Sequence, residues 1–459
     1  MKKLRLSTVS RATRHPQMSR GEMDSSQSLS PWLFAGALLV FGILCTLIRP
    51  DFYERTIAEP NLMFGNIKVY AYLILCTTVF IASASGGFWL HRRLRRSELP
   101  WIAGVETRQY TVVKGILWTL TGLNVLLAAI RLVYLQFTIG LGTILGTFSG
   151  GGSQVREEII QTLAAGNVGW ISDVTLGLTA AVLWVASQVL PHKRLPFMVL
   201  AYANLLLFMG ASLLTLSRDI MLTGLLIAIL IQIATIPGKS LVGRFRVFLI
   251  ALLGIVAFAG LFTLVAQSRS SGGGDTLVRQ FVGYFPASYN RLAALLEGTM
   301  VYPDSNWGFY STQWFWDFPV VTNIYKLYEL GQSVGIDLPK NQLDNWEGQF
   351  LAVQYAGFNR SYIWTTAYGF VYSDFGWFGS AVFGLYGLAA GWFYRSFRRG
   401  SMSGGLFYPY ILTTIIKWWS ILYISSRTTD VMFIVFVLIS IITWFFNQLR
   451  RPRMSQRTT

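Results

Sequence analysis

The sequence predicts an all-α polytopic membrane protein with about ten transmembrane helices and one long extracytoplasmic loop. The chain is 53% hydrophobic and 13% charged, whereas a soluble domain carries about 25% charged residues. Its apolar residues form long runs, each close to the ~20 residues that cross the hydrocarbon core as a helix. Lys and Arg gather in alternate connections between these runs, which is the pattern that orients membrane helices.

The apolar runs divide the chain into five parts in order. A basic tail over 1–30, without the small-residue cleavage site of a signal peptide, precedes a transmembrane bundle over 31–267. A long loop over 268–363 follows, then further transmembrane helices over 364–449 and a tail over 450–459. Only helices satisfy their own backbone groups in lipid. We therefore expect one helix for each run, at 31–48, 67–90, 111–138, 166–190, 196–216, 219–236, 246–267, 364–394, 405–424 and 429–448.

The basic connections fix the orientation. If the N-terminus is cytoplasmic, the cytoplasmic side receives HRRLRR (91–96), HKR (192–194), KSLVGRFR (239–246), RSFRR (395–399) and both basic tails. The short connections on the opposite side hold only Arg49, Arg55, Arg156, Arg218 and Arg427. Both termini are therefore expected in the cytoplasm and the long loop outside it. The net charge of +17 then reflects topology and contact with anionic membrane lipids, not nucleic acid.

The distribution of polar residues excludes several kinds of chemistry at the outer face. The three histidines (His15, His91 and His192) all fall on the cytoplasmic side. An imidazole general base or a zinc site with histidine ligands is therefore not expected outside. The chain has no phosphate-binding P-loop, and Cys45 and Cys76 lie within apolar runs. We expect neither a metal nor another cofactor.

The long loop is the only segment outside the apolar runs that is large enough to hold a substrate. After a Gly-rich exit over 268–275, Pro286 and Gly298 predict a helix over 287–297. On this helix Asn290 and Arg291 share a face with two alanines, which leaves room for a ligand beside the guanidinium. A solvated arginine on an interfacial helix is the equally weighted alternative.

Further along the loop, an aromatic block over 307–318 includes Trp314. Its rings suit sugar faces, but the aromatic belt of a membrane interface is the favoured interpretation. The segment 323–331 predicts an amphipathic surface helix, and Asp304 and Glu347 are candidate bases.

Two outer turns each contain an arginine and an aspartate. They are Arg218 with Asp219, and Arg427 with Asp430. Such charges at a membrane boundary are costly unless they are paired or functional. Pairing within each turn is one interpretation. In the other, these arginines converge with Arg279, Arg291 and Arg360 over one pocket, where their forked groups match the oxygens of a lipid-linked diphosphate.

Three segments resemble a known family. They are Ser217–Arg218 at the outer start of a middle span, the Arg- and Tyr-rich opening 279–292, and YIWTTAYGFVYSDFGWFGSAVFGLYG (362–387), which contains Tyr372, Asp374, Phe375 and Gly376. Over most of its length the chain resembles the Wzy-type oligosaccharide repeat-unit polymerases (O-antigen polymerases) of bacterial envelopes. The related ligases usually carry a histidine in their large outer loop, and its absence here favours a polymerase.

The resemblance implies a glycosyltransferase-C-like protein of the bacterial cytoplasmic (inner) membrane that makes a surface polysaccharide or exopolysaccharide. It implies metal-independent, inverting transfer, with an undecaprenyl-diphosphate-linked glycan as donor and as acceptor, and a chain-length regulator protein as a candidate partner. The protein must stabilise the leaving diphosphate and remove a proton from the acceptor hydroxyl. The candidate catalytic residues are Arg218, Arg279, Arg291, Asp304, Glu347 and Asp374, and the candidate substrate-binding residues are Tyr284, Tyr289, Asn290, Trp314, Arg360 and Arg427.

A transporter or flippase of lipid-linked glycans is the alternative. Such proteins carry polar or broken sites deep in several spans and are often internally repeated. The sequence shows Lys114, Arg131 and Lys417 within its apolar runs, no inverted repeat and one large loop on a single side, which favours an enzyme at the outer face.

Overall fold

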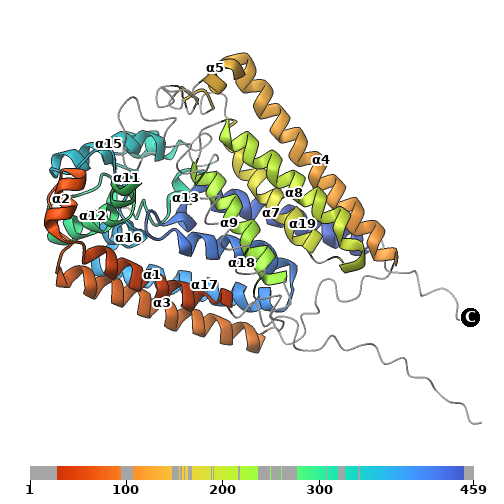
Figure 1. Cartoon of the computed structure of the whole chain (residues 1–459), viewed down its shortest axis with the longest axis horizontal. Coiled ribbons are helices and arrows are strands. Elements are labelled where there is room, and N and C mark those ends of the chain that lie inside the picture. The colour runs from red at the N-terminus through yellow and green to blue at the C-terminus, as the bar shows by residue number, and fades with distance from the viewer. Residues whose placement is uncertain are drawn as a thin grey trace, which may run out of the picture.

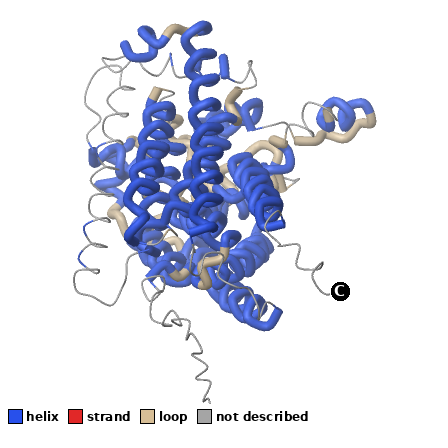
Figure 2. Tube along the Cα trace, turned by 90° about the vertical axis from the view of Figure 1, so that its right-hand side faces the viewer, coloured by secondary structure: helices blue, strands red, loops and turns tan. Residues whose placement is uncertain are grey.

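A computed structural model describes most of the chain: residues 28–94, 107–146, 168–187, 191–214, 218–235, 277–305, 308–318, 326–339 and 342–448, with a few residues between these ranges. In this part of the chain every regular element is a helix, and Figure 2 shows helices and loops without a strand. The all-α class is therefore confirmed for the described residues.

Three helices are long and apolar enough to cross a membrane: α3 (Ile67–Leu94), α4 (Thr107–Thr138) and α8 (Pro191–Leu213). A fourth span results if α1 (Pro31–Thr46) and α2 (Pro50–Ile57), bent by 87°, are counted together. Three further apolar helices are shorter: α7 (Ile171–Ser187), α9 (Arg218–Thr235) and α18 (Met402–Ile416). These helices indicate a membrane protein. The predicted run 246–267 lies outside the described residues.

The first group of helices is built on a close pair, α3 and α17 (Ser380–Arg398), which run side by side (Figure 1). A Cβ atom at Gly87 would overlap the backbone carbonyl of Leu388, and one at Gly391 would overlap that of Ala84. Small residues let helix backbones approach this closely in membranes, where packing drives association. Helix α1 packs on the same pair, with the rings of Trp32 and Tyr394 5.2 Å apart.

The second group contains α4, α7, α8, α9 and α19 (Arg427–Gln448) (Figure 1). Hydrogen bonds between polar side chains link three of these helices. Asn124 of α4 donates to Thr179 of α7 (3.1 Å) and to Asn204 of α8 (3.0 Å), and Asn204 donates to Thr121 of α4 (3.0 Å). Helix α18 packs against both groups.

The predicted single helix over 364–394 is wrong. The chain forms α16 (Ala367–Phe375), bends at Gly376 (φ +56°), makes a short 3₁₀ turn over Gly376–Gly379 and only then enters α17. The residues of α16 are apolar because they pack within the protein: Tyr368 stacks on Phe383, and Tyr372 contacts Tyr72 edge to face. The predicted run 405–424 also ends early, because α18 stops at Ile416.

A set of shorter helices gathers at one end of the molecule (Figure 1). It comprises α2, α11 (Leu277–Tyr284), α12 (Pro286–Glu297), α13 (Gln313–Trp316), α14 (Leu327–Ser333), α15 (Gln342–Tyr355) and α16. We call this set the outer region. It has its own apolar core, which includes Met300, Tyr302, Phe309, Tyr310, Val353, Phe358 and Phe370.

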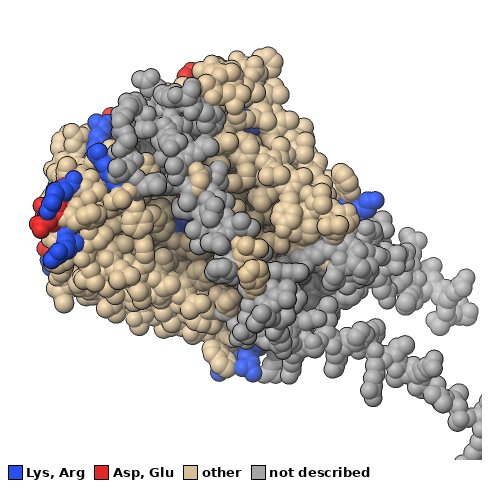
Figure 3. All heavy atoms as spheres, in the orientation of Figure 1, with Lys and Arg blue, Asp and Glu red and all other residues tan. Residues whose placement is uncertain are grey.

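Two of the helices predicted from the sequence lie in the outer region. The helix predicted over 287–297 is confirmed as α12, and Gly298 ends it in the left-handed conformation (φ +72°) that glycine adopts without strain. Of the helix predicted over 323–331, residues 323–325 lie outside the described residues; Lys326 has φ +45°, and helix α14 follows it from Leu327. On the face shown in Figure 3, the visible charged side chains gather mainly at the left-hand end of the molecule, where the outer region lies, and a few further Lys or Arg side chains lie at the right and lower edges.

Candidate functional site

A buried carboxylate, Glu59, organises the base of the outer region. Ala58 ends α2 in the left-handed conformation (φ +55°), and Glu59 follows it directly. Glu59 pairs through both carboxylate oxygens with Arg291, whose Nη2 lies 2.7 Å from Oε2. The hydroxyl of Tyr53 and the backbone N–H of Asn359 (2.8 Å) also donate to it. The side chains of Glu59 and Arg291 are both 0% exposed.

Arg291 and Asn290 form further hydrogen bonds within the protein, although the Nε–H of Arg291 has no acceptor among the described residues. Arg291 donates to the carbonyls of Ala287 (3.1 Å) and Asn359 (3.2 Å). Asn290 accepts from the N–H of Leu62 (2.7 Å) and donates to the carbonyl of Pro60 (2.8 Å). The solvated alternative for Arg291 is therefore wrong, and the expected room beside its guanidinium is filled by Glu59. These contacts form a clamp, here called the Glu59–Arg291 clamp, between the connection after α2, helix α12 and the turn after α15.

Asp374 lies near the C-terminal end of α16 (Ala367–Phe375). This end lies close to the start of α3, because Tyr372 of α16 contacts Tyr72 of α3. Its half-buried carboxylate accepts the backbone N–H groups of Ser311 (2.6 Å) and Tyr310 (3.3 Å). Burial raises the pKa of Asp374 to about 7, and the hydrogen bonds from Ser311 and Tyr310 limit the rise. A carboxylate with such a pKa exchanges protons near neutral pH.

The aromatic block next to Asp374 divides into two parts. Phe309 and Tyr310 are 0% and 3% exposed and belong to the core of the outer region. Trp314 and Phe315 are 44% and 37% exposed and present their rings at the surface. A part of the block therefore holds the loop in place, and only the rest is open to a ligand or to lipid.

The other two candidate bases differ in their surroundings. Asp304 accepts a hydrogen bond from the side-chain amide of Asn345 (3.0 Å) and, like Asp374, acts electrostatically on Tyr310. Glu347 is exposed on α15. The structure thus places two of the three predicted carboxylates around Tyr310 and the third at the surface.

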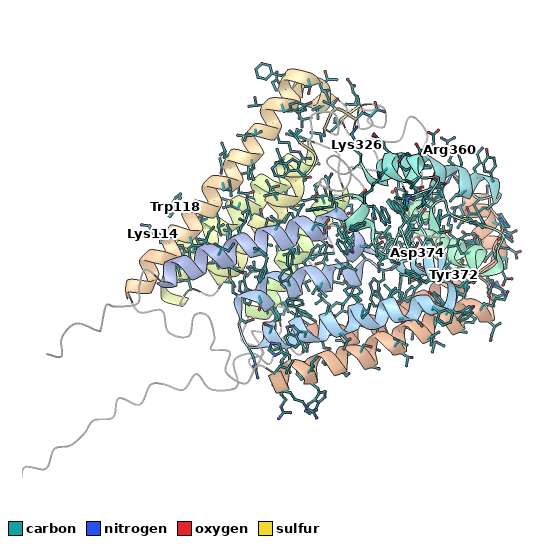
Figure 4. The ribbon with its side chains drawn as sticks, turned by 180° about the vertical axis from the view of Figure 1, so that it is seen from behind. Lys114, Trp118, Lys326, Arg360, Tyr372 and Asp374 are labelled. Atoms are coloured by element: carbon teal, nitrogen blue, oxygen red, sulfur yellow. The ribbon has the colours of Figure 1, made fainter. Side chains whose placement is uncertain are left out.

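Arg279 and Arg360 are both exposed in the outer region. Arg279 lies one turn before Gly283 on α11, and a Cβ at Gly283 would overlap the ring of Tyr362. Arg360 precedes Tyr362 by two residues and lies over the ring of Phe350 (5.9 Å). Arg279 is thus linked to Tyr362 through α11, and Arg360 along the chain; we call the part of the surface around Tyr362 the Arg279–Arg360 surface. Figure 4 shows Arg360 and Asp374 at the same end of the molecule but apart from each other.

Tyr284 and Tyr289 flank the start of α12 and have different environments. The ring of Tyr284 lies edge to face with that of Tyr362 at 5.7 Å, so it is part of the Arg279–Arg360 surface. Tyr289 is 1% exposed and fills the space that Gly42 of α1 leaves. Tyr289 therefore packs α12 onto the first helix group.

The outer turns of the second group have other partners than predicted. Arg427 forms its ion pair with Asp173 of α7 (3.7 Å), not with Asp430, and Asp219 pairs with Lys417 (2.5 Å). The side chain of Arg218 lies outside the described residues. Arg291 and Arg427 each have an acidic partner of their own, so these two guanidinium groups are engaged within the protein; the convergence of the predicted arginines over one pocket stays a prediction.

Sequence reasoning missed several of these residues. Glu59 is separated from Arg291 by 232 positions, so no local pattern links them, although a lone glutamate before a proline in an outer connection was a weak signal. Asp173 and Lys417 were visible as charges within apolar runs, but their partners were not.

The fold and the site define a helical membrane protein with a packed outer region that holds a half-buried carboxylate, Asp374, and two exposed arginines, Arg279 and Arg360. In the part of the chain that the structure describes, no three or more His, Cys, Asp or Glu side chains are placed to hold a metal ion. No protein-family model, no curated protein and no solved structure matches the chain.

Proposed function

We propose that the protein polymerises polyprenyl-diphosphate-linked oligosaccharide repeat units at the outer face of the bacterial cytoplasmic membrane, as a metal-independent inverting glycosyltransferase. The topology proposed with it has about ten spans and cytoplasmic termini. The positions of basic residues support this orientation: α3 ends with Arg92 and Arg93, and α17 ends with Arg395 and Arg398, at the end opposite the outer region.

The observation that carries the proposal is the environment of Asp374. The acceptor hydroxyl must lose its proton as the new glycosidic bond forms, and the donor must lose its diphosphate. A general base works best when its pKa is near the working pH. Asp374 meets that condition, and two backbone N–H groups fix the carboxylate while leaving lone pairs for the acceptor.

The leaving diphosphate needs cationic donors that a substrate can reach. Arg279 and Arg360 are exposed near the Tyr284–Tyr362 contact, and the planar fork of arginine matches phosphate oxygens. Arg291 contributes indirectly in this arrangement, because it holds the carbonyl of Asn359 next to Arg360. The exposed rings of Trp314 and Phe315 are suited to the C–H faces of sugars.

The test measures elongation of the glycan chain by the purified protein. The substrates are lipid-linked repeat units isolated from cells that produce this protein. Asp374→Asn should lower turnover about 10²–10⁴-fold if Asp374 is the general base. Activity of the unaltered protein should fall as the pH drops through about 7, because the carboxyl of Asp374 becomes protonated. Excess EDTA should leave elongation unchanged.

Asp337→Asn is the matched control, because Asp337 is an exposed acid of the same region. If Asp374 only holds the loop over 310–311, its asparagine variant keeps most of its turnover and the pH profile does not change. That result, or activity lost in EDTA and restored by Mg²⁺ or Mn²⁺, contradicts the proposal.

Transport of the same lipid-linked glycans is the second candidate, and one observation favours it. Asn124, Asn204 and Arg131 are buried polar residues within the second helix group, where a transporter places its substrate path. Proteoliposomes separate the two functions: a transporter moves lipid-linked repeat units across the bilayer without lengthening them.

A further inference from the structure

A buried lysine at the end of α18 pairs with a half-exposed aspartate at the start of α9, and neither takes part in the reaction proposed above. Lys417 directly follows α18, and its ammonium lies 2.5 Å from Oδ1 of Asp219 and 2.6 Å from the hydroxyl of Thr223. It also donates to the backbone carbonyl of Asp219 (3.2 Å). These three acceptors match the three N–H donors of a lysine. Lys417 therefore spends its donors on fixing the carboxylate of Asp219.

The two members of this ion pair differ in exposure. The side chain of Asp219 is 52% exposed, against 1% for Lys417. The ion pair of Asp173 and Arg427 in the same part of the protein has the opposite asymmetry, because there the carboxylate is 8% exposed and the arginine 38%. Of these two carboxylates, that of Asp219 is the one open to a ligand.

The Lys417–Asp219 pair lies level with the inner part of a membrane-spanning helix. Trp418, which follows Lys417 in the sequence, packs edge to face on Phe80 with ring centroids 4.8 Å apart. Phe80 is halfway along the 28 residues of α3, a helix long and apolar enough to cross a membrane. At about 1.5 Å per residue, the outer end of α3 is about 20 Å further along. A single lysine side chain cannot cover that distance, so Asp219 also lies at membrane depth.

The depth of Asp219 decides what its exposed side faces. An ionised carboxylate facing hydrocarbon is costly, and such residues within membranes face the bundle interior or a water-filled space. Beside it, the chain is non-helical over 417–422, which a membrane protein tolerates only where the backbone is buried or lines such a space. The half-exposed side of Asp219 therefore faces water and not acyl chains.

We propose that water reaches Asp219 from the outer side of the membrane, and that its second carboxylate oxygen, Oδ2, binds hydroxyl groups of a glycan there. Lys417 is the positioning residue for this carboxylate. The ion pair is neutral as a whole, so it favours neither a phosphate nor a metal ion, whereas a carboxylate oxygen accepts hydrogen bonds from hydroxyls. The glycan as ligand rests on the proposed function, but the access of water does not.

The first test measures the access of water in proteoliposomes treated with a charged, membrane-impermeant thiol reagent. Asp219→Cys should react many times faster than Leu206→Cys, because the reactive thiolate forms in water and not in lipid. Leu206 is 72% exposed on the neighbouring helix α8, so a cysteine there faces lipid. The unaltered protein gives the background, since Cys45 and Cys76 are buried. The double variant Asp219→Cys with Lys417→Met gives the same readout without leaving a buried lysine unpaired.

The second test measures binding of the repeat-unit oligosaccharide after its release from the lipid. It should raise the melting temperature of the full-length protein by a few degrees relative to an equal concentration of sorbitol. The double variant Asp219→Ala with Lys417→Met leaves neither charge and should lose this shift. Lys417→Met alone should reduce it, because the carboxylate is no longer held. Asp337→Asn should keep it, since Asp337 is an exposed acid of the outer region.

Each result supports or overturns a stated part of the inference. Labelling of both Asp219→Cys variants no faster than that of Leu206→Cys would show a structural ion pair without access to water, and would overturn the proposal. The absence of a shift with the oligosaccharide, or an unchanged shift in the double variant, would remove the glycan site. An unchanged shift in Lys417→Met alone would remove the positioning role. Elongation is measured separately: a protein that binds the oligosaccharide through Asp219 but does not elongate keeps this site and loses the proposed function, and one that elongates without the shift does the reverse.

Discussion

Breaking the Glu59–Arg291 clamp is the most direct test of how the outer region is held together. Arg291→Met removes the guanidinium and keeps much of the side-chain volume. The carboxylate of Glu59 then stays buried with Tyr53, Asn290 and the N–H of Asn359 as its remaining donors. Because both side chains are 0% exposed, no solvent replaces the lost partner.

The expected cost follows from the behaviour of buried ion pairs. Removing one partner of such a pair lowers the free energy of unfolding by about 3–5 kcal/mol, since an uncompensated charge remains. The double variant Glu59→Gln with Arg291→Met leaves neither charge and should cost less than the sum of the single changes. We expect the two changes to be coupled by about 1–3 kcal/mol.

The assay compares thermal melts of the purified variants with elongation per folded molecule. If the clamp is structural, Arg291→Met lowers the melting temperature, and the turnover of the remaining folded protein changes only a few-fold. The sequence-based hypothesis predicts another pattern: an unchanged melting temperature with turnover lower by about 10²–10³-fold, as for a lost donor to the leaving group. The second pattern would refute the clamp and restore Arg291 as a diphosphate ligand.

Two further predictions concern topology and helix packing. A reporter that is active only outside the cytoplasm should give a signal when fused after Gly331 and none after Gly400; the reverse result contradicts the orientation and the outer site together. Gly391→Leu should prevent accumulation of folded protein, because its side chain would overlap the backbone of Ala84, whereas Gly36→Leu should be tolerated because its Cβ meets no neighbour; equal folded yields of the two variants would show that the α3–α17 contact is looser than described.

Local chemistry made part of the fold predictable. Pro286 and Gly298 mark the two ends of α12 because proline suits the first turn of a helix and glycine suits its left-handed end. The apolar runs of α3, α4 and α8 were long enough to be recognised as membrane helices. These features depend on residues close together in the sequence, so a single sequence suffices to predict them.

Other parts depend on contacts that no local pattern encodes. The run 364–394 is predominantly apolar, but α16 packs its aromatic residues Tyr372 and Tyr368 against Tyr72 and Phe383. Hydrophobicity does not distinguish these two environments, so the bend at Gly376 was missed. The partners of Arg291 and Arg427 were missed for a related reason, since Glu59 lies in the connection after α2 and Asp173 on α7, both far away in the sequence.

Accessibility separates the predicted arginines into two groups with different physical roles. Arg291 is enclosed by acceptors from its own chain, so a phosphate can reach it only by displacing Glu59 from a fully buried pair. Arg279 and Arg360 are exposed, and a diphosphate can bind them without breaking the clamp. The presence of an arginine in the sequence is therefore not sufficient to locate a phosphate-binding site. In this protein burial excludes Arg291, because the fold has already paired it with a fully buried carboxylate.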